Sequence, residues 1–357
     1  MSRLGSMGAR LYHGHASYDF VGKRKIWYSV SGIILIVVLG GLGLRGLNLG
    51  IEFKGGAEFQ LQSSSASVST ARTAAASVGQ ADAIVTILNG DRVRVQTGAI
   101  DEAESQKIAT ALADAFDVAS AEVRVQLVGP TWGGDVTSKA AQGLFVFLLL
   151  VIIFLSVYFE WKMAVAAIVA LIHDLVITVG VYALVGFEVT PATVIGLLTI
   201  LGYSLYDTVV VFDKVKENTR GIAGQSRRTY SGAANLALNQ TLVRSINTSV
   251  VALLPVAAIL AFGVGLLGAG TLKDLALALF VGMIAGTYSS IFVATPVLAQ
   301  LKEQEPAMVA VAKRVAQRGG DVTEAPIGTP VSTVASGPHV KSTGARVQPR
   351  RQPKRKR

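Results

Sequence analysis

The sequence has 357 residues, of which 51% are hydrophobic and only 16% are charged. Because soluble proteins contain about 25% charged residues, this composition is typical of a membrane protein. The net charge of +10 does not indicate nucleic acid as a partner, since Lys and Arg lie in short segments beside apolar stretches. The sequence contains no cysteine and no Walker-type motif, which excludes disulfides, thiolate chemistry and an ATPase site of its own.

Six apolar stretches have the length of about 20 residues that a membrane-spanning helix needs. They cover residues 27–47, 141–158, 163–185, 192–212, 242–262 and 275–298. The first stretch is longer than the apolar region of a signal peptide, so we expect an uncleaved signal anchor as transmembrane helix 1. The other five stretches place transmembrane helices 2 to 6 within residues 136–300.

The connections between these stretches differ in their content of Lys and Arg. Both residues are abundant in the N-terminal segment 1–26, in the connection after the fourth stretch and in the tail after residue 300. The connections 186–191 and 263–270 contain neither of them. Because Lys and Arg are retained on the cytoplasmic side, we expect a multi-pass protein of the cytoplasmic membrane with both termini in the cytoplasm.

Residues 48–135, between the first two stretches, have the pattern of a folded extracytoplasmic domain. Apolar residues alternate from Gly50 to Gln62, which predicts a half-buried strand. Strands at 83–88 and 92–97 flank Asn89-Gly90-Asp91, which is a hairpin signal. Helices at 67–78 and 101–116 and a last strand at 122–128 complete the order βαββαβ. We therefore expect a membrane all-α bundle of six transmembrane helices with an inserted α+β ferredoxin-like domain.

The tail, residues 301–357, is basic and becomes rich in Pro, Gly, Ser and Thr from about Gly319 onward. Such a composition without apolar periodicity predicts a disordered cytoplasmic tail. We expect its Lys and Arg residues to attract anionic lipid.

Ionisable residues inside membrane spans cost several kcal/mol and mark functional paths. Asp207 lies about 16 residues, or roughly 24 Å, from the start of its stretch, and Arg244 lies about 19 residues, or roughly 28 Å, from the end of its own. We therefore expect both charges in one layer. A carboxylate and a guanidinium at matched depth are expected to pair, because either one alone is an uncompensated buried charge.

Polar neighbours at three- and four-residue spacing extend both charges into stripes along their helices. These neighbours are Tyr203 and Ser204 beside Asp207, and Gln240, Asn247 and Thr248 beside Arg244. Such stripes face a bundle interior or a water-filled crevice rather than lipid. The pair can act as a titrating proton relay, or it can be a static contact that sets the helix register.

Three other features of the spans need interpretation: the His173-Asp174 pair, Asp213 and a group of small residues. His173 and Asp174 are adjacent in the third span, about 100° apart around a helix, so we expect them to point in different directions. His173 can be a relay member or a hydrogen-bonded packing residue. Asp174 and Asp213 are also possible relay or supporting residues, and for Asp213 an interface position near Lys214 is the favoured interpretation. The small residues Gly282, Gly286, Ser289 and Ser290 predict close helix packing without a chemical role.

Several motifs resemble the SecF branch of the SecD/SecF family, within the resistance-nodulation-division superfamily. They are the glycine-flanked run at 50–56, His173-Asp174, the run at 202–218 and the run at 239–249. The resemblance covers about residues 10 to 300. Glu52 stands where the family more usually has Asp, and Tyr206 stands where Asn often precedes the key Asp. The segment Tyr18 to Val21 and the basic tail are similar to those of members from high-GC Gram-positive bacteria.

The resemblance implies a role in protein export rather than an enzymatic activity. Members of this branch pair with SecD and assist the SecYEG channel in exporting unfolded preproteins, late in translocation, with YajC and SecA as further possible partners. Proton entry is thought to drive movement of the extracytoplasmic domains, so the implied coupling ion is the proton and no cofactor or metal is expected. The residues implied in proton conduction are Asp207 and Arg244.

Three other classes of function are compatible with a six-span protein. A proton-coupled small-molecule exporter would need a second six-helix half in addition to this one. A membrane enzyme would need a catalytic set such as Ser, His and Asp or His-Glu-x-x-His, and the sequence does not contain one. A passive scaffold would use the charge pair only to hold helices together. The sequence does not distinguish a proton from a sodium ion as the coupling ion.

Overall fold

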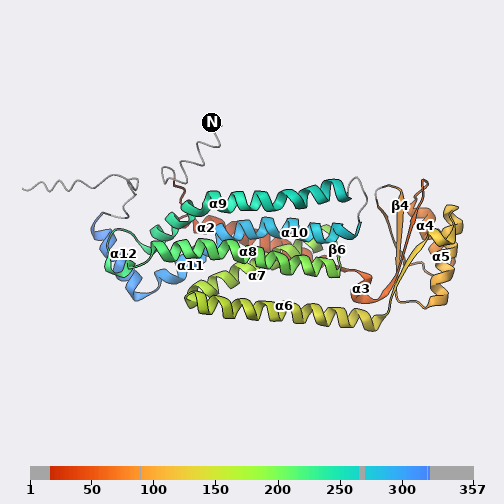
Figure 1. Ribbon diagram of the computed structural model, residues 1–357, viewed down its shortest axis with the longest axis horizontal. Coiled ribbons are helices and arrows are strands. Elements are labelled where there is room, and N and C mark those ends of the chain that lie inside the picture. Colours follow the sequence, from red (N-terminus) through yellow and green to blue (C-terminus); the bar gives the residue numbers. More distant parts are fainter. Residues whose placement is uncertain (1–16, 89, 265–269, 320, 322–357) are drawn as a thin grey trace, which may run out of the picture. The chain divides into compact units, whose positions relative to one another are not determined.

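The structure is a computed structural model that describes residues 17–88, 90–264, 270–319 and 321 (Figure 1). Six helices in the described residues are long and apolar enough to cross a membrane, which confirms the six predicted spans. They begin with α2 (Arg24–Arg45), α6 (Pro130–Tyr158), α7 (Trp161–Val185), α8 (Pro191–Asn218), α9 (Tyr230–Ala258) and α10 (Gly270–Ser289). Two of them continue, α9 through the π-helix η3 (Ile259–Val264), and α10 through the π-helix η4 (Ser290–Ala294) into α11 (Thr295–Glu303).

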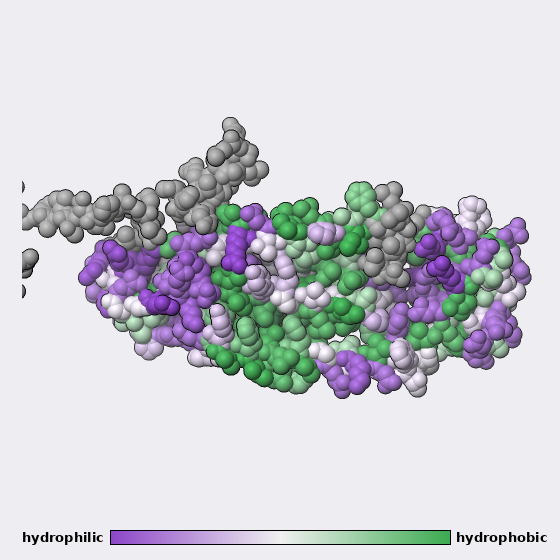
Figure 2. Space-filling view, in the orientation of Figure 1, coloured by the Kyte–Doolittle hydropathy of each residue, from purple (hydrophilic) through white to green (hydrophobic). Residues whose placement is uncertain are grey.

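The six helices differ in how much of their surface is buried within the chain. Helix α7 and the continuous α10–α11 helix are the most buried, whereas α6 has large apolar side chains such as Phe145 and Val157 exposed. Figure 2 shows apolar surface over the helices, with hydrophilic surface on both sides of it. This distribution is the one expected when lipid, rather than water, covers the outer helices.

A four-stranded antiparallel sheet lies between α2 and α6 in the sequence. Its strands are β2 (Gly56–Gln62), β3 (Ile84–Leu88), β4 (Arg92–Thr97) and β5 (Arg124–Val128), in the order β3-β4-β2-β5. Helices α4 (Val68–Ser77) and α5 (Glu102–Phe116) are capped by Ser67 and Asp101 and share a core with the sheet. Phe59 and Leu112 are among the fully buried residues of that core. The predicted strands and helices thus follow one another in the predicted order, with one exception.

The exception is the start of the first predicted strand. Residues Ile51–Lys54 form a short helix, α3, and β2 begins only at Gly56. Gly55 and Gly56 have φ angles of 77° and 145°, which glycine adopts at low cost, so the chain changes from helix to strand at this point. Phe53 packs with residues of the helical bundle instead of the sheet core. The alternation of apolar and polar residues over Ile51–Lys54 was too short to distinguish a strand from a single helical turn.

A second, two-stranded sheet joins the domain to the connection between α7 and α8. Strand β1 (Asn48–Leu49) pairs in parallel with β6 (Glu188–Val189). The backbone N–H of Gly50 continues the pairing by donating to the carbonyl of Val189 at 2.9 Å.

The predicted disordered tail begins too early. Helix α11 runs to Glu303, and α12 (Pro306–Gln317) follows it. Val311 and Val315, four residues apart, are buried on one face of α12, and Lys162 and Lys302 both pair with Glu305 at its start. This amphipathic spacing was visible in the sequence and was missed. Residues 322–357 lie outside the described residues, and so does the predicted contact of their basic side chains with anionic lipid.

Part of the predicted N-terminal segment also packs against the bundle. Phe20 and Val21 are buried, and the backbone N–H of Tyr18 donates to Asn239 at 2.8 Å. Asn239 belongs to the polar motif of α9, so one residue of that motif holds the N-terminal segment in place.

Candidate functional site: two buried aspartates bridged by serines

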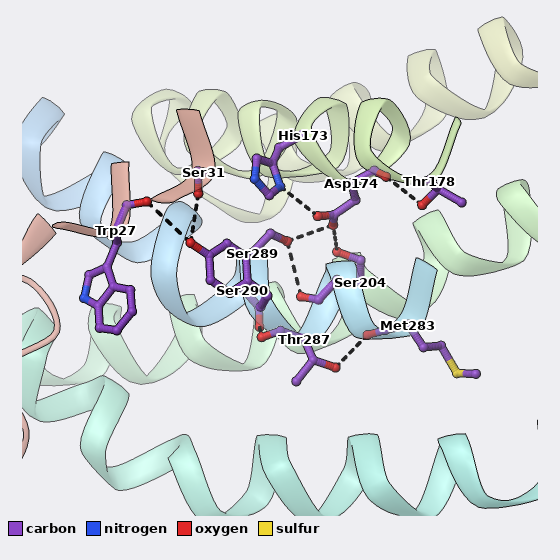
Figure 3. Close-up of polar contacts among 12 residues, drawn as sticks. Trp27, Ser31, His173, Asp174, Thr178, Ser204, Met283, Thr287, Ser289 and Ser290 are labelled. Carbon is purple, nitrogen blue, oxygen red and sulfur yellow. Dashed lines mark hydrogen bonds and ion pairs between the residues drawn. The ribbon is translucent and has the colours of Figure 1, made fainter. Parts of the chain in front are cut away.

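Asp174 lies on α7 and is only 1% exposed. Its Oδ2 accepts hydrogen bonds from the Ser204 hydroxyl of α8 at 2.5 Å and from the Ser289 hydroxyl of α10 at 2.8 Å (Figure 3). Its Oδ1 lies 3.3 Å from Nδ1 of His173. The carboxylate of Asp174 therefore connects three helices of the bundle.

His173 points toward Asp174, contrary to the expectation that adjacent residues of a helix diverge. The ring stacks on Tyr288 with centroids 6.0 Å apart, and Nε2 is buried without a partner among the described residues. The Tyr288 hydroxyl in turn lies 3.0 Å from Oγ of Ser31 on α2. His173 is therefore part of the polar cluster around Asp174.

Asp207 lies on α8 and is 6% exposed. Its Oδ1 accepts a hydrogen bond from Ser245 of α9 at 2.7 Å, and its Oδ2 accepts one from Ser290 at 2.5 Å. Ser290 is the first residue of the π-helix η4. A π-helical turn changes the direction of the side chains that follow, and such turns occur frequently at functional sites.

Ser289 and Ser290 connect the two aspartates. These consecutive residues donate to Asp174 and Asp207 respectively, so hydroxyls from adjacent positions of one helix reach two carboxylates on two other helices. Ser204 strengthens the connection, because it contacts Asp174 and lies three residues before Asp207 on α8. The sequence interpretation of Ser289 and Ser290 as packing residues did not include these hydrogen bonds. Each of them is buried and hydrogen-bonded to an aspartate.

Glycines on α10 allow α8 to approach closely enough for these contacts. A Cβ at Gly286 would lie 2.8 Å from the Cβ of Ser204, and a Cβ at Gly282 would lie 2.2 Å from a side-chain carbon of Ile200. The prediction of close helix packing at these two glycines is therefore confirmed. Ser204, which contacts Asp174 of α7, therefore packs directly against Gly286 of α10.

Asp207 and Arg244 do not form the predicted ion pair. The guanidinium of Arg244 is exposed and donates to the hydroxyl of Tyr206 at 3.1 Å. Asp207 faces Ser245 instead. In the structure Arg244 thus contacts the residue before Asp207, and Asp207 contacts the residue after Arg244. A step of one residue rotates a side chain by about 100° around the helix axis. Depth along the helices was estimated from the sequence, but the rotation of α8 and α9 about their axes was not.

The other predicted residues have different surroundings. Tyr203 donates to Ser249 of α9 at 3.2 Å, close to the network. Gln240 accepts from Asn218 at 3.0 Å, and Thr248 donates to the backbone carbonyl of Arg244 at 2.8 Å. Asn247 and Asp213 are exposed, in contrast to the two buried aspartates. No group of three or more His, Asp or Glu in the described residues is arranged to hold a metal ion.

The comparison with known proteins places this bundle in a family. Residues 107–304 match the model of the protein export membrane protein SecD/SecF, C-terminal, and residues 40–66 match the SecD/SecF GG motif. The chain is 57% identical over 316 residues to protein translocase subunit SecF of Streptomyces coelicolor, which covers 88% of this chain and 85% of that protein. The chain belongs to the SecF family of protein translocase subunits.

Further relatives and a solved structure agree with this family. The chain is 45% identical over 330 residues to SecF of Mycobacterium tuberculosis, covering 89% of this chain and 75% of that protein. A crystal structure of SecDF, a translocon-associated membrane protein from Thermus thermophilus, matches with a TM-score of 0.73 and 28% identity. That match covers 84% of this chain but 42% of the SecDF chain, so this chain spans about two fifths of the solved one.

These comparisons establish a multi-pass membrane protein of the Sec export pathway. The Streptomyces and Mycobacterium relatives agree with the predicted resemblance to members from high-GC Gram-positive bacteria. The names of the family describe transport rather than catalysis.

Proposed function

We propose that this SecF-family chain acts with SecD as a proton-driven accessory unit of the SecYEG channel, which promotes late steps in the export of unfolded preproteins. The proposal rests mainly on the two buried aspartates and on the serine hydroxyls that bridge them. Charged groups inside a membrane protein are functional by default, and the hydroxyls that contact each carboxylate can rotate between donor and acceptor roles when its protonation changes.

Protonation of Asp207 would change the contacts that hold three helices together. As an ionised carboxylate it accepts from Ser245 of α9 and Ser290 of η4. When protonated, one of its oxygens becomes a donor, so one serine has to rotate and accept instead of donating. This exchange alters the hydrogen bonds between α8, α9 and the π-helix. A proton that binds at Asp207 can thereby shift helix packing, which is the step that a proton-driven machine requires.

The position of Arg244 supports the proposed pairing with SecD. An exposed guanidinium within a membrane span is costly to leave facing lipid, so another membrane protein with an acceptor group at that depth should cover it. The surface of α8 and α9 that carries Tyr206 and Arg244 is therefore the surface that we assign to SecD. This chain matches only about two fifths of the solved SecDF chain. The remainder of that chain leaves room for a SecD part beside the part that resembles this chain.

Several finer assignments belong to the same proposal. The chain lies in the cytoplasmic membrane with both termini in the cytoplasm, which follows from the Lys and Arg content of its connections. The four-stranded sheet domain is then ferredoxin-like and extracytoplasmic, within the predicted bounds 48–135. YajC and SecA are further candidate partners, anionic lipid binds the basic tail, and no metal or organic cofactor takes part.

The test is preprotein export by membrane vesicles that contain the chain together with SecD and SecYEG. Asp207→Asn keeps the size of the side chain but removes its titrating group, so we expect export to lose its dependence on an imposed proton gradient. Asp114→Asn, in the exposed part of α5, is the matched control and should leave that dependence unchanged. Normal gradient-dependent export by the Asp207→Asn variant would favour the passive scaffold.

A further inference from the structure

A group of charged and amide side chains connects the sheet domain to the connection between α7 and α8. Nη2 of Arg94 on β4 lies 2.6 Å from the Glu188 carboxylate on β6. Nε2 of Gln96, two residues further along the same strand, donates to Glu188 at 2.7 Å and to Glu58 of β2 at 2.8 Å. We call Glu58, Arg94, Gln96 and Glu188 the joint.

The joint is shielded from solvent, unlike an ordinary surface ion pair. The side chains of Glu188, Glu58 and Arg94 are 9%, 12% and 20% exposed. Ion pairs that are removed from water and supported by further hydrogen bonds have more defined geometry than exposed pairs, which contribute little. Removing one partner leaves the other charge partly buried without compensation.

An apolar cluster beneath the joint attaches it to the helices. Val189, which follows Glu188, is buried with Tyr182 of α7 and Ile200 of α8. Phe53 of α3 packs against the same cluster. On the other side, Gly133 of α6 lies so close to Phe53 that a Cβ there would be 2.6 Å from the Phe53 carbonyl oxygen. The domain therefore contacts the bundle through its sheet and through α3.

Glu188 lies in the chain segment that links the helices of the two buried aspartates. Strand β6 lies in the short connection between α7, which carries Asp174, and α8, which carries Asp207. A shift of α7 against α8 that follows a change at either aspartate moves this connection. The sheet domain is held to that connection by β1–β6 pairing and by the joint.

We infer that Arg94, Gln96 and Glu188 form the coupling contact through which a relative movement of α7 and α8 reaches the sheet domain. This inference rests on the proposed function for its biological meaning, but the contact itself can be tested separately. Arg94 and Glu188 are positioning residues in this role, since neither contacts the buried aspartates. Loss of the joint should uncouple the domain from the helices without blocking proton movement.

The first experiment measures the position of the domain. Because the chain contains no cysteine, spin labels can be attached to cysteines introduced at Thr110 on α5 and at Val185 at the end of α7, both of which are exposed. We expect Glu188→Gln and Arg94→Gln to broaden the distance distribution between the labels, and Arg94→Lys, which keeps the charge, to restore most of the original width. Arg24→Gln, which removes a 2.7 Å ion pair between α2 and Glu303, is the control and should not broaden it.

The second experiment compares export with proton flux in vesicles that contain the chain, SecD and SecYEG. We expect Glu188→Gln to reduce gradient-dependent export by about five- to tenfold, the lower end of the coupling that is typical between sites, while proton flux stays unchanged. A flux that falls together with export would overturn the inference, and so would distance distributions that the joint variants leave unchanged. If the unsubstituted complex shows no proton flux, the proposed function fails, whereas the distance measurement still decides whether the joint holds the domain.

Discussion

At the residue scale, each buried aspartate accepts hydrogen bonds from serines of neighbouring helices. Asp174 and Asp207 use four hydroxyls in all, and the consecutive residues Ser289 and Ser290 serve one aspartate each. Hydroxyl groups can exchange donor and acceptor roles by rotating, which a guanidinium cannot do. The observed serine partners can therefore remain hydrogen-bonded to either form of a carboxyl group, which the predicted arginine could not.

Glu52 gives a pH-dependent prediction outside the membrane-spanning helices. Burial raises the pKa of Glu52 above its ordinary value of 4.5, and the carboxylates of Glu188 and Glu58 add to this rise, while its own backbone N–H and Arg94 oppose it. The folded chain therefore holds this proton at pH values where the unfolded chain has lost it. The resulting stabilisation is present at low pH and is lost as the pH rises above 4.5 and through the raised pKa.

We expect Glu52→Gln to remove this contribution. Thermal unfolding of the full chain in detergent, measured in steps from pH 4.5 upward, should show a smaller decrease in Tm for the variant than for the unsubstituted chain. Glu58, Glu188 and Arg94 are present in both proteins, so the difference between the two curves isolates Glu52. Parallel curves would show that the environment of Glu52 does not favour its protonated form.

At the element scale, the sequence predicts positions along a helix better than directions around it. Hydropathy located all six spans, because lipid requires long apolar runs. The predicted Asp207–Arg244 pair failed because depth does not determine how α8 and α9 are rotated. Ser290 reaches Asp207 from the first residue of a π-helical turn, for which a single sequence offers no clear signal.

The close approach of α8 and α10 is a second feature of this scale. Gly286→Ala should push Ser204 away from Asp174, because the added Cβ would lie 2.8 Å from the Cβ of Ser204. We expect a loss of about 1–3 kcal/mol of stability, seen as a lower Tm in detergent. The same substitution at Gly202, whose Cβ would have no neighbour within 4 Å, is the matched control. An equal Tm for both variants would mean that the helix interface is loose.

At the scale of the whole molecule, we expect a partner protein to bind the surface of α8 and α9 that carries Tyr206 and Arg244. Arg244 is exposed within a span, and Val251, seven residues further along α9 and therefore on the same face, is 67% exposed. We expect a photo-cross-linker on the single cysteine of a Val251→Cys variant to capture SecD in membranes that contain both proteins. Val157 on α6 is 84% exposed, and the same cross-linker on Val157→Cys should not capture SecD. Equal capture from both positions would contradict the proposed partner surface.

The central claim is that Asp207 and its serine partners carry a proton path. The most direct measurement is proton flux into vesicles that contain the chain and SecD, under an imposed gradient. We expect Asp207→Asn to abolish the flux, Ser290→Ala to reduce it by removing one of the two donors to Asp207, and Asp114→Asn to leave it unchanged. A flux for Asp207→Asn equal to that of Asp114→Asn would show that the buried network is structural, and it would contradict the claim.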